Sequence, residues 1–263
     1  MLRKLLKYNI KDMYKPMIIF YVLTIFFALT TRILISINQT FIINILGKIS
    51  MGCFFSMIFS ALINTLIRNW VRFKDFFYSD ESYLTHTLPV TKNKLYESRF
   101  LLSVINLATT FIIIIISLLI AYYSKDNFEI LIKNISNLTN SINVSFTGTI
   151  IYLVLILFLE IFNGLQSGFL GIIIGYSFNN YKFGLSVLFG FITYFVTQIL
   201  VLFIIFIFGL FNKDIMLMFT SSSIINFNVL KQVAIITLIL YVFITALINI
   251  LCLIKLNKGV NVD

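Results

Sequence analysis

The sequence predicts an all-α polytopic membrane protein with six transmembrane helices, and three observations lead to that fold class. Of its 263 residues, 60% are hydrophobic and 11% are charged, whereas soluble domains are roughly 45–50% apolar and about 25% charged. Only 2 prolines and 11 glycines interrupt the long runs of Ile, Leu and Phe. These runs do not alternate with polar residues, which excludes a membrane β-barrel. In lipid, the helix is the other structure that satisfies its own backbone.

Six charge-poor runs are each long enough for one transmembrane helix, which needs about 20 residues. They cover about residues 17–37, 49–67, 101–123, 150–178, 183–211 and 232–254. The fourth and fifth are longer than a bilayer core requires, so each either tilts or extends outside it. Residues 38–48 could lie in the interface, and residues 212–228 could form a short re-entrant or interfacial helix. The short connections leave one transmembrane domain over residues 1–263.

The first 16 residues predict an amphipathic interfacial helix rather than a cleaved signal peptide. Their basic stretch precedes an apolar one, but no small-residue cleavage site follows. Apolar residues recur at helical spacing with basic residues between them: Leu2, Leu5, Leu6, Ile10 and Met13 alternate with Arg3, Lys4, Lys7 and Lys11. Such a helix lies flat on the inner leaflet and binds membrane lipid.

The basic residues set the orientation, since six spans place both termini on one side of the membrane. Fourteen fall on the side of the termini: Arg3, Lys4, Lys7, Lys11, Lys15, Arg68, Arg72, Lys74, Lys92, Lys94, Arg99, Lys182, Lys255 and Lys258. Six fall on the other side: Arg32, Lys48, Lys125, Lys133, Lys213 and Lys231. The positive-inside rule makes the first side cytoplasmic, so we expect a plasma-membrane protein with both termini in the cytoplasm. The net charge of +10 then reflects topology and anionic lipid, and no nucleic-acid partner is expected.

In this topology the one long cytoplasmic loop covers residues 68–100. Its first part continues the second span as a helix that Trp70, Phe73 and Phe77 anchor at the interface. Thr91 can cap a further helix over residues 92–99 that runs directly into the third span. The loop is therefore expected to hold two extended helical arms.

Between these arms the sequence predicts a short helix. Ser79 or Asp80 can cap it, and it must end by Leu88 because a residue that precedes a proline avoids the α conformation. Its tip is apolar, with Tyr83, Leu84, Leu88, Pro89 and Val90. A solvated connector is one interpretation. A docking surface for another protein is the other, because a connector does not need an exposed apolar patch.

Residues 80–90, DESYLTHTLPV, with Lys94 and Arg99 after them, resemble the E-G-Y-L-T-x-x-L-P-V segment of permease subunits of type-2 ABC exporters of Gram-positive bacteria. The opening residues 5–11 resemble the start of the same family. Ser82 stands where that family usually has glycine, and Arg99 where it usually has lysine. The motifs cover about a tenth of the chain, and the six-span topology covers the remainder less specifically.

The resemblance implies a cytoplasmic coupling helix that docks into a cleft on a separate nucleotide-binding ATPase subunit. The docking residues it implies are Glu81, Tyr83, Leu84, Thr87, Leu88, Pro89 and Val90. Two copies, or this chain and a related permease, would form a pathway for a peptide or another amphiphile, in antimicrobial-peptide export or immunity. The chain has no phosphate-binding G-x-x-x-x-G-K-[ST] motif. We therefore expect that the chain is not an enzyme and holds no cofactor. ATP and Mg²⁺ are expected to bind to the partner subunit.

Glu160 is the one acidic residue deep in a predicted span, and an intramembrane carboxylate indicates function by default. Asn163 and Ser167 share its helical face, and Gln166 lies at the edge of that face. This stripe is expected to line the pathway or a subunit interface. The alternative is a protonated, structural glutamate. A self-contained channel or secondary transporter with Glu160 in its pathway is the alternative function.

The same span has four glycines that predict close helix packing: Gly164, Gly168, Gly171 and Gly175. A hinge between the first and the last is the bolder interpretation. Cys53 and Cys252 lie in predicted spans without metal-ligand spacing, and we expect them to be buried small side chains. His86 has no partner for a metal site or for catalysis.

Overall fold

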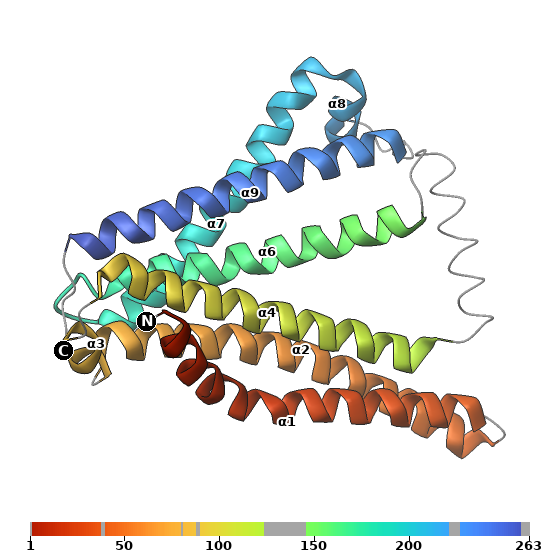
Figure 1. The fold of residues 1–263 in the computed structure, drawn as a ribbon. Coiled ribbons are helices and arrows are strands. Elements are labelled where there is room, and N and C mark those ends of the chain that lie inside the picture. Colours follow the sequence, from red (N-terminus) through yellow and green to blue (C-terminus); the bar gives the residue numbers. More distant parts are fainter. Residues whose placement is uncertain are drawn as a thin grey trace. The chain divides into compact units, whose positions relative to one another are not determined.

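The computed structural model describes residues 2–37, 40–79, 81–87, 90–123, 146–220 and 227–258. Every regular element in these residues is an α-helix. Six of the helices are long and apolar enough to cross a membrane, which confirms the prediction of an all-helical, multi-pass membrane protein. The chain divides into two compact units, residues 1–128 with 262–263, and residues 129–261 (Figure 1).

The first unit contains α1 (Leu2–Ile37), α2 (Phe41–Tyr78), α3 (Glu81–Thr87) and α4 (Lys92–Tyr122). The three long helices run side by side, and α1 packs on both α2 and α4 (Figure 1). The short helix α3 lies at one end of this unit, against α2.

Helix α1 joins two segments that the sequence separates. The interfacial helix predicted over residues 1–16 and the first span over residues 17–37 form one helix, with Pro16 inside it. A proline in a helix interior removes one backbone hydrogen bond and its ring displaces the preceding turn, which bends the helix. Figure 1 shows the first turns of α1 bending away from the remainder. The side chains of residues 1–9 lie outside the described part, so the amphipathic surface stays a prediction.

Helices α2 and α4 are longer than the spans predicted for them. The second span is predicted over residues 49–67, but α2 begins at Phe41, where the Thr40 side chain accepts a hydrogen bond from the Ile43 backbone N–H. Most of the segment predicted for the interface, residues 38–48, therefore belongs to α2. Its other end continues to Tyr78, as the aromatic face predicts. Helix α4 likewise unites the predicted cytoplasmic helix and the third span.

The interior of the first unit has an apolar end and a polar middle. Phe54 and Ala28 are fully buried in the apolar cluster. In the middle, the Thr110 hydroxyl lies 2.9 Å from the Thr65 hydroxyl and 2.8 Å from the Tyr21 hydroxyl. Hydrogen bonds between side chains thus join α1, α2 and α4, as is common where polar residues pack between membrane helices.

The second unit contains α6 (Phe146–Gly175), α7 (Lys182–Phe211), α8 (Lys213–Thr220) and α9 (Phe227–Asn257). Helix α6 packs on α7 and α9, and α8 packs on the same two helices. The fourth span, predicted to reach residue 178, ends at Gly175 in a turn. Helix α8 forms the first part of the segment predicted over residues 212–228. Its Ile215 is 2% exposed, and the Asn212 side chain donates to Gln232 Oε1 at 3.0 Å.

Candidate functional site

Helix α3 stands on an aromatic base at the end of α2. Phe73, Phe76 and Phe77 are buried there with Tyr96 of α4. The Phe73 ring lies 4.9 Å from the Phe77 ring and edge-on to Tyr96 at 6.1 Å, both measured between centroids. Offset and edge-on contacts of this kind stabilise aromatic clusters. The ends of α2 and α4 are therefore packed together directly beneath α3.

Two buried hydroxyl residues form the inner face of α3. The Thr85 hydroxyl lies 2.9 Å from the Phe76 backbone oxygen, across the turn, and 2.9 Å from the Ser82 backbone oxygen. Ser82 is fully buried, and its backbone N–H donates to the Ser79 oxygen at 2.7 Å. Ser82, in the place of the glycine usual in the resembled segment, is thus buried in α3 with its hydroxyl oxygen unpartnered among the described residues.

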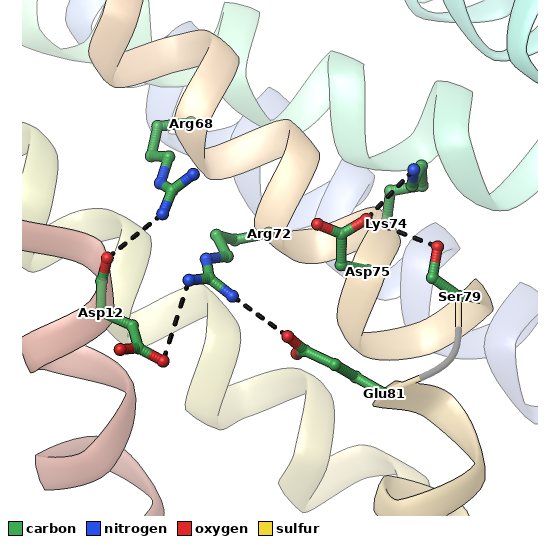
Figure 2. A network of polar contacts seen from close by, with 7 residues as sticks. All are labelled: Asp12, Arg68, Arg72, Lys74, Asp75, Ser79 and Glu81. Carbon is green, nitrogen blue, oxygen red and sulfur yellow. Dashed lines mark hydrogen bonds and ion pairs between the residues drawn. The ribbon is translucent and has the colours of Figure 1, made fainter. Parts of the chain in front are cut away.

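A charged network links α3 to the two neighbouring helices (Figure 2). Arg72 of α2 donates from Nη1 to Glu81 Oε1 of α3 at 3.1 Å, and its Nη2 lies 3.8 Å from Asp12 Oδ2 of α1. Arg68, one turn earlier, donates to the Asp12 backbone oxygen at 3.2 Å. The Arg72 side chain is 19% exposed, so water screens these contacts less than it screens a fully exposed ion pair. One guanidinium thus bridges α1 and α3.

A second arm of the network lies on the same turn of α2. Asp75 Oδ1 lies 3.1 Å from Lys74 Nζ and accepts from the Ser79 hydroxyl at 3.4 Å (Figure 2). The Ser79 hydroxyl thus donates back to α2, and a capping bond from this hydroxyl to the α3 backbone is not found among the described residues. The segment that enters α3 is tied to α2 by this bond.

Arg99 anchors α4 to the same base. It is 5% exposed, and its guanidinium carbon lies 3.8 Å from the centre of the Phe76 ring. A guanidinium over an aromatic face is a favourable cation–π geometry, and Arg stacks in it better than Lys. The arginine that stands in the place of the usual lysine thus stacks on Phe76 and ties α4 to α2.

The described members of the predicted docking set on α3 are exposed. Tyr83 is 61% exposed and Thr87, one turn later, is also exposed, whereas Val90 is half-buried. Glu81 is the residue of this set that points back to Arg72. Leu88, Pro89 and the side chains of Leu84 and His86 lie outside the described residues. The outward face is therefore defined by Tyr83 and Thr87.

Sequence reasoning missed how this end of the unit is held. It counted Arg68 and Arg72 among the cytoplasmic basic residues but did not connect them to Asp12, which is 60 residues from Arg72 along the chain. It also did not pair Arg99 with Phe76. The nine-residue separation of Arg72 and Glu81 across a predicted turn was the one local signal available.

The polar stripe of α6 lies mostly inside the second unit. Asn163, Gln166 and Ser167 are at most 1% exposed, and Asn163 Nδ2 donates to Thr197 Oγ1 of α7 at 2.9 Å. Glu160 is half-buried. The stripe predicted from spacing therefore meets α7, and its role in a pathway or an interface stays a prediction.

The glycines of α6 differ in what surrounds them. A Cβ atom built on Gly171 would lie 2.6 Å from the Ser186 backbone oxygen, and one built on Gly175 would lie 2.5 Å from the Ser186 Cα. The Gly168 Cα lies 3.5 Å from a Cβ built on Gly190 of α7, whereas Gly164 has an ordinary 3.8 Å contact with Tyr194. Helices α6 and α7 thus approach most closely near their connecting turn.

Within the described ranges, no three His, Cys, Asp or Glu side chains lie together as a metal site would require. Cys252 is buried and Cys53 half-buried, and the two do not form a disulfide with each other. Protein-family models, curated proteins and solved structures give no significant match to this sequence. The contacts around α3 and Glu160 are therefore the basis on which a function can be assigned.

Proposed function

We propose that this chain is the membrane-spanning permease subunit of an ATP-driven ABC exporter in the plasma membrane. A separate ATPase subunit, which binds ATP and Mg²⁺, supplies the energy, and the permease moves a peptide or another amphiphile outward. A second permease copy, or a related permease, completes the pathway. The six apolar helices support a membrane role, and the resemblance of residues 80–90 supports this kind of transporter.

The distribution of charge supports an orientation with α3 in the cytoplasm. An even number of spans places both termini on the side of α3, and fourteen of the twenty basic residues fall on that side. The bent start of α1 then lies at the cytoplasmic leaflet, where its basic residues can bind anionic headgroups. A soluble ATPase would reach α3 from this side.

The observation that supports the proposal most directly is the way α3 is held. Its inner face is fixed by Thr85, Ser82 and the Arg72–Glu81 pair, while Tyr83 on its outer face is 61% exposed. Tyrosine is favoured at protein interfaces because its ring is apolar and its hydroxyl is polar. Helix α3 is thus a braced surface that is open to a partner.

The bracing also suggests how a partner could act on the membrane helices. Helices α2 and α4 both run without a break from the base of α3 to the other end of the unit. Phe73 and Tyr96 are each 1% exposed between them, and closely packed interiors transmit displacement rather than absorb it. A push on α3 by an ATPase would therefore move α2 and α4 together.

The test is co-purification of the full chain in mild detergent, followed by identification of bound subunits and ATPase activity. The double variant Tyr83→Asp/Thr87→Asp should lose the ATPase subunit. Docking would bury the two new carboxylates in the interface without a partner charge, which opposes binding. The matched control is Asn93→Asp, which adds a charge at an exposed site near the start of α4. We expect the control to retain the partner. A double variant that keeps a stoichiometric ATPase would disprove docking through this face.

The alternative is a self-contained channel or secondary transporter with Glu160 in its pathway. Such a protein would transport after purification alone, with no nucleotide requirement. Transport by the reconstituted chain that is unchanged by removal of ATP and of every partner would establish the alternative and reject the exporter.

A further inference from the structure

The second unit contains a polar cluster that the docking proposal does not use. Three helices contribute to it, and it is called here the Glu160 cluster: Glu160 and Asn163 of α6, Tyr194, Thr197 and Gln198 of α7, and Tyr241 of α9. Glu160 lies in the middle third of its candidate span, Ile150–Gly175, whereas Asp12, Asp75 and Glu97 lie near the ends of theirs. A carboxylate at that depth is costly in lipid and indicates a functional partner.

Side-chain contacts join the three helices near this carboxylate. Asn163 Nδ2 donates to Thr197 Oγ1 at 2.9 Å, and the Tyr241 hydroxyl donates to Gln198 Oε1 at 3.1 Å. Tyr194 lies one turn before Gln198, and its ring is 3.8 Å from the position of a Cβ on Gly164. Gly164 in turn lies one helical turn after Glu160. Tyr194 therefore packs on α6 one turn from Glu160, and Tyr241 is joined to the same part of α7 through Gln198.

The carboxylate itself has no partner within the part of the chain that the structure describes. Neither a hydrogen bond nor an ion pair to Glu160 is found there. The lysines of the described helices of this unit lie at helix ends, for example Lys182 and Lys255. The Asn163 Oδ1 atom is buried without a hydrogen-bond partner in the same residues, and Asn163 is fully buried. Two acceptors on α6, about one helical turn apart, therefore have no partner among these residues, and neither has the buried Nε2 donor of Gln198 on α7.

The available chemistry selects one class of ligand. A carboxylate, an unused amide oxygen and two tyrosine rings attract positive charge, and aromatic faces beside a carboxylate are a common arrangement for organic ammonium groups. An anion would meet Glu160 unfavourably, and a neutral apolar group would leave both acceptors unpaired. We propose that the Glu160 cluster binds the cationic group, an ammonium or a guanidinium, of an amphiphilic substrate. This inference rests on the proposed transport function, but binding tests it independently of any ATPase.

The experiment compares two ions of the same shape and opposite charge. The purified full chain, with any subunits that co-purify, is placed in lipid nanodiscs, and binding of tetraphenylphosphonium and tetraphenylborate is measured by equilibrium dialysis against empty nanodiscs. Saturable binding of the cation is expected. Glu160→Gln should weaken binding of the cation at least tenfold and should not weaken binding of the anion. Glu97→Gln, which neutralises an exposed glutamate on α4, should leave both unchanged.

Two further variants keep the test decisive if Glu160→Gln does not fold, as judged by gel filtration. Glu160→Asp retains the charge and should bind the cation more tightly than Glu160→Gln does. If Glu160→Gln is unfolded, Glu160→Asp should instead bind the cation within tenfold of the wild-type affinity. Tyr194→Leu removes one ring and should weaken cation binding about threefold. The proposal is overturned if the wild type shows no saturable cation binding, if Glu160→Gln binds it normally, or if both ions lose affinity equally. Loss of the ATPase partner would affect none of these results.

Discussion

The close approach of α6 and α7 makes Gly171 the position where one added methyl group should matter most. A Cβ atom there would lie 2.5 Å from the Gly190 Cα and 2.6 Å from the Ser186 oxygen, both of them backbone atoms of α7, whereas ordinary contacts begin at 3.4 Å. Since neither atom belongs to a flexible side chain, Gly171→Ala must separate the two helices. To bring the closer of these two contacts, at 2.5 Å, to the ordinary 3.4 Å, the backbones must move apart locally by 0.9 Å.

The expected loss of stability follows from two opposing effects. Overpacking of a tight interior costs typically about 1–3 kcal/mol, and the better helix propensity of alanine offsets roughly 0.5–1 kcal/mol of that. A net destabilisation of about 1–2 kcal/mol is expected for Gly171→Ala, or on the order of 5 °C in the unfolding midpoint. Gly184→Ala on α7 is the matched control, because a Cβ there would have nothing within 4 Å.

The assay is thermal unfolding of the detergent-solubilised protein, followed by the fraction that remains monodisperse at each temperature. Because unfolding of membrane proteins is often irreversible, all variants are heated at one rate and compared as apparent midpoints. Gly184→Ala should unfold at or slightly above the wild-type temperature. If Gly171→Ala unfolds no earlier than Gly184→Ala, the helices are not in backbone contact at this position and the packing account is refuted.

Two further predictions concern the base of α3. Arg99→Met removes the guanidinium from the Phe76 ring and should destabilise the protein by about 0.5–2 kcal/mol, measured as the apparent unfolding midpoint; no change would contradict the stacking. Arg72→Gln and Glu81→Gln, alone and together, should show a coupling energy of about 0.2–1 kcal/mol in a double-mutant cycle, because the pair is partly exposed. Strictly additive effects would show that this ion pair does not fix α3.

The ends of a helix could be predicted from the sequence wherever a local residue signal sets them. Thr91 marks the start of the helix that enters the third span, although its side chain makes no capping hydrogen bond. Pro89 predicts that the short helix stops early. The start of α2 was predicted too late because residues 41–48 are only moderately apolar, and their helix depends on continuity with the span. Pro16 did not divide α1, since a long helix can bend at proline rather than end there.

The candidate sites show the same division between local and distant information. Spacing alone placed Asn163 and Ser167 on the face of Glu160. It could not show that Thr197 meets that face or that Tyr241 bonds to Gln198, because those contacts depend on how three helices pack. Likewise, the bridge from Arg72 to Asp12 joins residues that only the tertiary structure brings together. Sequence periodicity gives the face of a helix but not the identity of its neighbour.

The central claim, that α3 is the docking element for an ATPase, is tested most directly by site-specific photo-cross-linking in the native membrane. A photoreactive phenylalanine analogue replaces Tyr83, which is 61% exposed, or Phe219 of α8, which is 46% exposed, as a control. The account predicts that the probe at residue 83 cross-links to a nucleotide-binding subunit and the probe at residue 219 does not. Cross-linking at residue 83 to lipid alone, or to no protein, would contradict the account.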